Sequence, residues 1–178
     1  MGCVCAQALQ VSQLPCGFIA GGQLAALEGQ SIELLIVGGA VMVMEFGSRL
    51  STRDLDGIVT NNIDRALVRS YVATVAQERG WPHDWLNDAA KGFIANAPDA
   101  VVMMSALGIR VSRPALEQLL AMKLCAWRDD TDVADAARLL AELRGNNDEI
   151  WAKIEPHLQL GQELKARYAF EDLCDSRQ

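Results

Sequence analysis

The sequence predicts an α+β fold, in which a mixed β-sheet is flanked by helices and followed by a helical C-terminal part. Strand-like apolar segments cluster in the first two thirds of the chain, and helical periodicity dominates the last third. The chain has 178 residues, of which 51% are hydrophobic and 22% are charged. That length and composition are typical of a single globular domain with a substantial core.

The N-terminal residues 1–17 show no clear periodicity and are expected to be a lead-in. Apolar residues at helical spacing predict a helix over residues 18–29, where Gly29 would end it. We place the domain at residues 18–145 and treat residues 146–178 as a C-terminal helical extension of the same domain.

The next segment combines an apolar strand with a pair of glycines. Ile32–Val37 is largely apolar and β-branched, which predicts a buried strand. Gly38 and Gly39 follow it, and a short helix is expected over Ala40–Phe46. A second strand is predicted over Asp54–Thr60.

The rest of the chain shows the same two periodicities. Helices are expected at 63–79, Trp85–Phe93, 114–127, Asp132–Leu143 and, broken at Pro156, Asp148–Leu173, and strands at Val101–Met104 and Gly108–Val111.

The charge and composition exclude several classes of function. A net charge of -7, from 16 basic and 23 acidic residues, disfavours a broad nucleic-acid platform but permits local binding of a nucleotide through a divalent metal. No apolar stretch is long enough to span a bilayer, so no membrane association is expected. Five cysteines without zinc-site spacing predict free thiols in a reducing, cytoplasmic compartment.

Two carboxylates begin the second strand. Asp54 and Asp56 are two residues apart, so they share one face of a strand. Adjacent carboxylates repel each other unless a cation lies between them, and hard oxygen ligands at this spacing suit Mg²⁺, in a one-metal or a two-metal arrangement. The alternative is that the pair forms an exposed, solvated strand face.

The glycine pair supplies the second half of the pattern. A strand that ends at Gly38 and Gly39 before a helix exposes backbone N–H groups, which suits phosphate binding. Arg53 could add a charged contact to phosphates, or it could form a structural ion pair with Asp54. Alternatively, Gly38 and Gly39 form only a tight turn and bind no phosphate.

The stretch from Leu34 to Thr60, LLIVGGAVMVMEFGSRLSTRDLDGIVT, resembles the signature of the nucleotidyltransferase superfamily, the DNA polymerase β-like proteins. It is most similar to small bacterial nucleotidyltransferase-like proteins related to abortive-infection and toxin–antitoxin toxins. The resemblance implies a nucleotidyltransferase-like sheet, an NTP substrate and Mg²⁺. The implied site residues are the catalytic, metal-binding Asp54 and Asp56 and the nucleotide- or phosphate-binding Gly38, Gly39, Thr52 and Arg53.

The resemblance continues to about residue 142. Residues 119–124, LLAMKL, look like a helix of the same proteins and imply a catalytic role for Lys123. A lysine on an apolar helix stripe needs a partner or a snorkelling route, and Asp132 and Asp135 are candidate partners. These two acids could instead form a helix cap.

One departure from the family pattern concerns a third carboxylate. We expect it on the segment Val101–Val111, which contains no acid, and Asp88 is a candidate substitute. Without it, the general base that would activate an acceptor hydroxyl is unassigned.

The sequence therefore favours two alternative functions. The first is an enzyme that transfers NMP from an NTP to a hydroxyl of an RNA, a protein or a small molecule. The second is a catalytically degenerate nucleotide- or partner-binding module, such as one component of a toxin–antitoxin pair with an antitoxin-like protein partner. A weaker third option is a structural protein.

Overall fold

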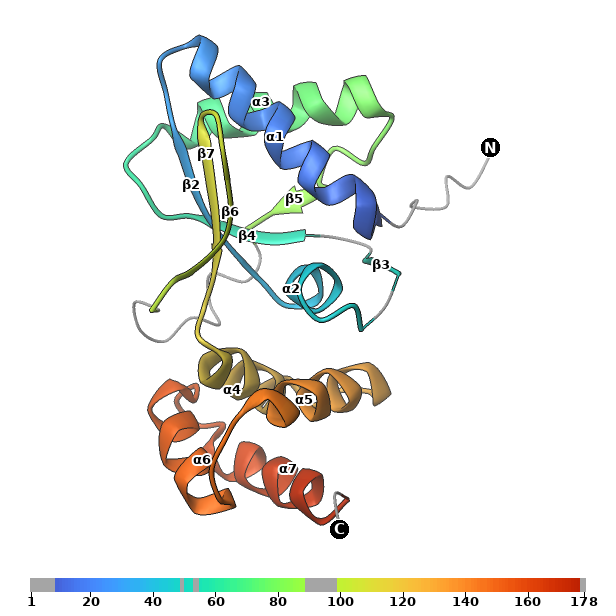
Figure 1. Ribbon diagram of the computed structural model, residues 1–178, viewed down its shortest axis with the longest axis vertical. Helices are drawn as coiled ribbons and strands as arrows, with labels where there is room; N and C mark the ends of the chain where they lie inside the picture. The colour runs from blue at the N-terminus through green and yellow to red at the C-terminus, as the bar shows by residue number, and fades with distance from the viewer. Residues whose placement is uncertain (1–8, 49, 53–54, 89–98, 177–178) are drawn as a thin grey trace. The chain divides into compact units, whose positions relative to one another are not determined.

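The computed structural model describes residues 9–48, 50–52, 55–88 and 99–176 (Figure 1). The chain divides into two compact units. The sheet unit comprises Met1–Ala90 and Ala100–Arg113, and the helical unit comprises Lys91–Asp99 and Pro114–Gln178. The predicted α+β class is confirmed, and the predicted domain limits stay a prediction.

A five-stranded mixed sheet forms the centre of the sheet unit. Its strands are β2 (Ile32–Val37), β4 (Leu55–Val59), β5 (Leu86–Asn87), β6 (Val101–Ala106) and β7 (Ile109–Arg113). Their spatial order is β5-β4-β2-β7-β6. The β2·β7 and β4·β5 pairs are parallel, whereas β2·β4 and β6·β7 are antiparallel. β2 therefore lies at the middle, which explains why an almost wholly apolar strand is needed there.

A second, two-stranded sheet pairs β1 (Leu9–Gln10) with β3 (Ser51–Thr52) in antiparallel fashion. A 3-10 turn over Val11–Gln13 joins β1 to the first helix. β1 and the 3-10 turn lie within residues 1–17, which were expected to be a lead-in, and β3 directly precedes the predicted second strand.

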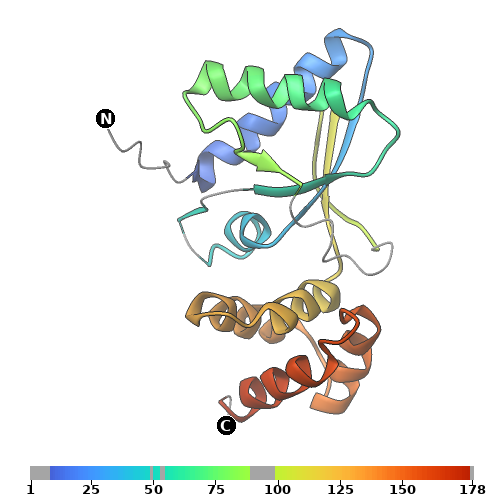
Figure 2. The same cartoon turned by 180° about the vertical axis from the view of Figure 1, so that it is seen from behind.

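Three helices belong to the sheet unit: α1 (Leu14–Leu27), α2 (Gly39–Met44) and α3 (Arg65–Arg79). α1 and α3 contact each other and lie side by side over one face of the sheet, as both views show (Figures 1 and 2). α3 begins at Asp64, whose carboxylate accepts a hydrogen bond from the Ala66 N–H, and ends at Gly80 in the left-handed conformation. Both ends are the caps expected of a stable helix.

The helix after Trp81-Pro82 was predicted wrongly. Leu86–Asn87 is a strand, and residues 89–93 of the predicted segment lie outside the described residues. The physical reason is the fixed position of Trp85, which is only 2% exposed. Its indole N–H donates to the Val72 carbonyl at 3.1 Å, and its own carbonyl accepts from the Leu55 N–H at 3.1 Å, so the chain is tied to the edge of β4.

The helical unit contains α4 (Leu116–Ala126), α5 (Asp130–Glu142), α6 (Asn147–Ile154) and α7 (Glu163–Asp175), with a 3-10 turn over Glu155–His157. The predicted break at Pro156 is confirmed by that turn.

Lys165 of α7 ties two of these helices together. Its Nζ donates to the carbonyls of Cys125 at 2.8 Å and Ala126 at 2.6 Å. The last carbonyls of a helix lack intrahelical partners, so this lysine satisfies the C-terminus of α4.

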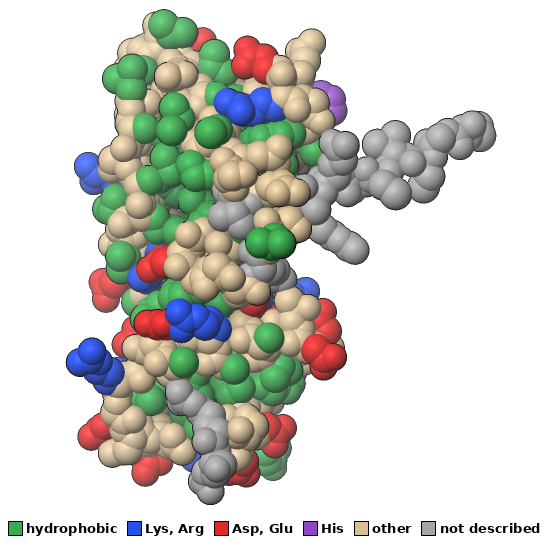
Figure 3. Space-filling model, turned by 45° about the vertical axis from the view of Figure 1, so that its right-hand side comes forward, with side chains coloured by type: hydrophobic (Ala, Val, Ile, Leu, Met, Phe, Trp, Pro, Cys, Tyr) green, Lys and Arg blue, Asp and Glu red, His purple; other side chains and the backbone are tan. Residues whose placement is uncertain are grey.

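Apolar side chains also reach the surface of the sheet unit, where Figure 3 shows them as green patches. The large exposed ones are Ile19, Leu27, Leu50, Val101, Val102 and Leu107. Among the described residues, none of the helices has the length and apolarity needed to cross a bilayer.

α1 approaches β7 so closely that a glycine is required at the contact. A Cβ on Gly22 would lie 2.5 Å from both Ile109 Cγ2 and the Leu107 carbonyl oxygen. The preceding Gly21 would meet nothing within 4 Å. Gly21 therefore has room for a side chain and Gly22 does not, although they are adjacent in one helix.

We expect Gly22→Ala to lower the free energy of unfolding by about 1–3 kcal/mol, because the contact with β7 is overpacked. Gly21→Ala should leave it unchanged or raise it by up to about 1 kcal/mol, because alanine is the better helix former. Urea denaturation of both variants checks this. Equal losses in the two variants would contradict the close approach.

Candidate functional site

Asp56 lies on β4, directly opposite Val37 at the end of β2. Residues that are paired across two strands point to the same face, so Asp56 shares a face with Val37 and not with Gly57. A Cβ built on the next residue, Gly38, would lie 3.5 Å from Asp56 Oδ2. The half-buried carboxylate therefore lies against the turn that follows β2.

Gly38 makes that turn possible. Its φ of 63° and ψ of −138° belong to a region that is essentially restricted to glycine. Gly38 is also the N-cap of α2, and no side chain caps this helix end. The first N–H groups of a helix have no intrahelical partners, so an anion next to Asp56 would find donors there. α2 itself contacts β2, β3 and β4.

The strand next to Asp56 brings in a residue that the sequence did not single out. β4 pairs with β5 in parallel, with Asp56 opposite Asn87. Asn87 therefore shares the face of Asp56. In the sequence, the stretch from Trp85 to Ala90 is marked by its resemblance to a segment of the same nucleotidyltransferase-like proteins and by Asp88. The pairing of Asp56 with Asn87, 31 residues further along the chain, is not visible in local periodicity.

The segment on which the third carboxylate was expected does not lie beside β4. β6 and β7, which cover Val101–Val111, lie on the far side of β2 from β4. The only strand beside β4 other than β2, in the described part of the sheet, is β5. Asp88, the candidate substitute, follows β5 and lines a cavity with Gly57 and Val59, which belong to the opposite face from Asp56.

Of the three other residues predicted near the phosphates and the metal, the structure describes only Thr52. Asp54 and Arg53 lie outside the described residues. Thr52 is on β3, opposite Leu9, and is 8% exposed. Its predicted contact with a nucleotide stays a prediction.

The described donors fit a hard divalent cation only in part. Asp56 and Asn87 present oxygen atoms on one face, which is the donor type that Mg²⁺ prefers. No group of three His, Cys, Asp or Glu among the described residues could hold a metal by itself. Mg²⁺ usually takes one or two carboxylates and completes its shell with water and substrate phosphates, so Asp56 with Asp54 would be sufficient.

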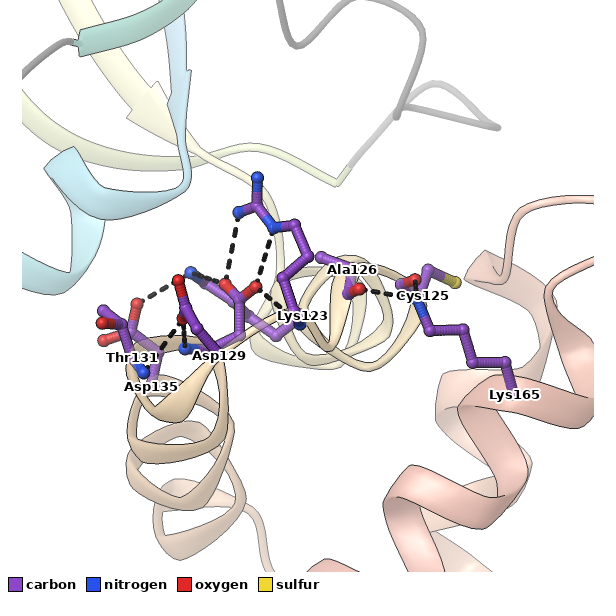
Figure 4. Close-up of polar contacts among 9 residues, drawn as sticks. Lys123, Cys125, Ala126, Asp129, Thr131, Asp135 and Lys165 are labelled. Atoms are coloured by element: carbon purple, nitrogen blue, oxygen red, sulfur yellow. Dashed lines mark hydrogen bonds and ion pairs between the residues drawn. The ribbon is translucent and has the colours of Figure 1, made fainter.

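The helical unit holds a separate cluster of charges (Figure 4). Lys123 Nζ lies 3.0 Å from Asp132 Oδ1 and 2.8 Å from Asp135 Oδ2. The Lys123 side chain is 12% exposed and each carboxylate 3%. The predicted partnership of Lys123 with both aspartates is confirmed, and α4 is thereby joined to α5.

Arg128 completes this cluster and was not anticipated. Its Nε donates to Asp132 Oδ2 at 2.9 Å, four residues along the chain. Burial would raise the pKa of Asp132, but hydrogen bonds from Arg128 and Lys123 outweigh burial and lower the pKa to about 2. The i,i+4 spacing of Arg128 and Asp132 was a usable signal that sequence analysis overlooked.

The capping role suggested for Asp132 belongs to Asp129. The Asp129 carboxylate accepts hydrogen bonds from the backbone N–H groups of Thr131 and Asp132, both at 3.0 Å. α5 therefore begins at Asp130, two residues earlier than predicted. This leaves the carboxylates of Asp132 and Asp135 for Lys123.

One ion pair stabilises the end of α2. The Arg113 guanidinium donates to both carboxylate oxygens of Glu45, with Nη2 at 2.6 Å from Oε1. Arg113 is 8% exposed and ends β7, so the bidentate pair connects α2 to the sheet.

A comparison with protein families gives a match over more than half of the chain. The model of a family described as "Nucleotidyl transferase of unknown function (DUF2204)" matches residues 21–123. This span includes Gly38, Asp56 and Lys123. No curated protein and no solved structure shows a significant match to the chain.

Replacing Lys123 should be costly because it removes the buried cation that the carboxylates of Asp132 and Asp135 share. We expect Lys123→Met to lower the free energy of unfolding by roughly 3–5 kcal/mol. Adding Asp132→Asn and Asp135→Asn to that variant should recover much of the loss, because no buried charge is then unpaired. Arg138→Ala, which breaks an exposed pair with Glu142 on the same helix, should cost under about 1 kcal/mol. Denaturant unfolding provides the measurement, and equal costs at Lys123 and Arg138 would contradict the cluster.

The lowered pKa of Asp132 predicts a pH dependence. A carboxylate whose pKa is depressed on folding stabilises the protein above its unfolded pKa and loses that contribution as pH falls through the folded value. The stability difference between wild type and Asp132→Asn should therefore be largest above about pH 4 and shrink towards pH 2. Asp148→Asn, at an exposed position in α6, serves as the control. A difference that is independent of pH would refute the assignment.

Proposed function

The chain belongs to this family of nucleotidyltransferases, and from that premise we propose that it transfers NMP from an NTP to an acceptor hydroxyl with the help of Mg²⁺. The observation that carries the proposal is the position of Asp56 Oδ2, 3.5 Å from the Cβ that Gly38 lacks. A carboxylate beside a glycine turn at the first N–H groups of a helix is what an NTP–Mg²⁺ complex requires at one place.

Each residue of this site would have a separate task. Asp54 and Asp56 would hold Mg²⁺, and the bound ion would neutralise charge that develops on the phosphates. The backbone of Gly38 and Gly39 would receive phosphate oxygens, which the absence of side chains permits. Arg53 would add a cation beside them.

In the proposed reaction, the acceptor oxygen attacks the α-phosphorus of the NTP. A bond forms between that oxygen and phosphorus, the bond to the bridging oxygen of the β-phosphate breaks, and pyrophosphate leaves. The acceptor hydroxyl gives its proton to solvent water in the same step. Asn87, on the face of Asp56, would orient the substrate by hydrogen bonding rather than accept its proton, because an uncharged amide is a weak base.

Lys123 belongs to the helical unit, where it already has counter-charges. Its ammonium already contacts two carboxylates, so its charge is balanced within the helical unit. We therefore assign it first to positioning α5 against α4, and a direct contact with phosphate stays a prediction. The acceptor can be an RNA, a protein or a small molecule, and the net charge of -7 favours contact with a nucleic acid only over a short stretch.

Thermal unfolding with Mg²⁺ and each NTP tests the proposal. Ligand at about a hundred times its Kd should stabilise the wild type by roughly 2.7 kcal/mol and raise its Tm. Asp54→Asn and Asp56→Asn should each abolish the Mg²⁺-dependent part of the shift, whereas the exposed Asp84→Asn should keep it.

Transfer itself is measured with a labelled NTP and candidate acceptors. Release of pyrophosphate that is lost in Asp56→Asn would support the enzyme. Nucleotide binding without transfer to any acceptor would instead favour a nucleotide-binding module, and the absence of any shift with every NTP would refute both.

A further inference from the structure

A second candidate site lies on the opposite face of β4 from Asp56. A cavity of about 310 Å³ is bounded by α3, by strands β2, β4 and β5, and by the chain around β5. Its volume is at the lower end of the range of small-molecule sites, which is roughly 300–1,000 Å³. All of its lining residues are described and belong to the sheet unit.

The cavity has an apolar floor. Leu34 and Val59 are paired across β2 and β4, and Leu86 approaches from β5. Gly57 lies between them without a side chain, and a Cβ there would meet Leu86 Cδ1 at 2.7 Å and Leu34 Cδ1 at 3.0 Å. The two leucines can therefore close over the strand and form a continuous apolar surface.

The rim carries two arginines one helical turn apart. Arg65 and Arg69 lie on α3 at i,i+4 spacing, so both side chains reach the same side of the helix. Both are exposed, and neither forms an ion pair or side-chain hydrogen bond with another described residue. Asp88 is the only acid that lines the cavity, so the lining bears a net positive charge in a chain of net charge -7.

The presence of an arginine at position 65 is not explained by helix stability. It occupies the first turn of α3, where a positive charge opposes the helix dipole and an acid would be favoured. Arg79 is different, because it lies in the last turn, donates to the Cys16 carbonyl at 3.1 Å and stacks on Trp81. An unpaired arginine at an unfavourable helix position, beside a cavity, points to a ligand rather than to folding.

We propose that this cavity binds a small organic anion that has an apolar body. Its phosphate or carboxylate group contacts the guanidinium groups of Arg65 and Arg69, and its apolar body lies on Leu34, Val59 and Leu86. Asp88 at the rim accepts hydrogen bonds from hydroxyl or amino groups of the ligand. This site is separate from the proposed transfer site, because β4 turns Asp56 to one face and Gly57 and Val59 to the other.

The test uses 1-naphthyl phosphate as the probe, titrated by calorimetry in EDTA so that binding through Mg²⁺ is excluded. We expect saturable binding to the wild type and to Asp56→Asn with equal affinity. The double variant Arg65→Gln/Arg69→Gln should bind about tenfold more weakly or worse, because it loses charge-assisted hydrogen bonds. Amide NMR shifts should change at Gly57 and Val72, on the two walls of the cavity.

The matched control is Arg110→Gln/Arg144→Gln, which removes the same charge from two exposed positions outside the cavity lining. It should keep the wild-type affinity, and neutral 1-naphthol should bind more weakly than the phosphate. Val72→Trp, which narrows the cavity from α3, should block binding while circular dichroism shows an intact fold. The proposal would be overturned by an equal loss of affinity in the two double arginine variants, by loss of binding in Asp56→Asn, or by the absence of saturable binding to the wild type.

Discussion

The register between β2 and β4 is the constraint on which both sites depend. Leu34 is opposite Val59, and Val37 is opposite Asp56. A slip of one residue would turn every side chain of β4 to the other face, so that Asp56 would be under α1 and α3 and no carboxylate would reach Gly38. Gly57 helps to fix this register, because a side chain at that position would meet Leu34 and Leu86. Gly57 therefore fixes the register, and that register places the preceding residue, Asp56, beside Gly38.

Local signals predicted much of the fold and some of the site. β2 has the predicted bounds because an apolar, β-branched run after a glycine admits few alternatives, and α3 has the predicted end because Gly80 adopts the left-handed conformation. The partners of Lys123 were predictable for a similar reason, since a buried ammonium requires counter-charges. In contrast, the order of the strands is decided by contacts between distant segments. The third carboxylate was expected at Val101–Val111, whereas the second strand beside β4 is β5, where Asn87 lies opposite Asp56. The helix expected at Trp85 failed because a tertiary hydrogen bond to Val72 overrides local periodicity.

Burial determines which cations of this chain must have a counter-charge. Lys123 is held between two carboxylates that are each 3% exposed, and Arg113 is paired with Glu45 through both carboxylate oxygens. Burial imposes this pairing, because an unpaired ion in the interior would be far more costly than in water. Arg65 and Arg69 are exposed, so solvent can stabilise them without a protein partner, and their charge remains available to a ligand at the cavity.

A single strand can serve two kinds of chemistry because its side chains alternate. On β4, Asp56 lies on the face that has the glycine turn, and Val59 with Gly57 lies on the face that has α3. The first face has an acid and backbone donors, which suit a metal-bound phosphate; the second has an apolar floor and arginines, which suit an organic anion without metal. β4 pairs with both β2 and β5, so its backbone belongs to both sites. Because side chains alternate along the strand, the two ligands would contact opposite faces of β4 without sharing a side chain of that strand.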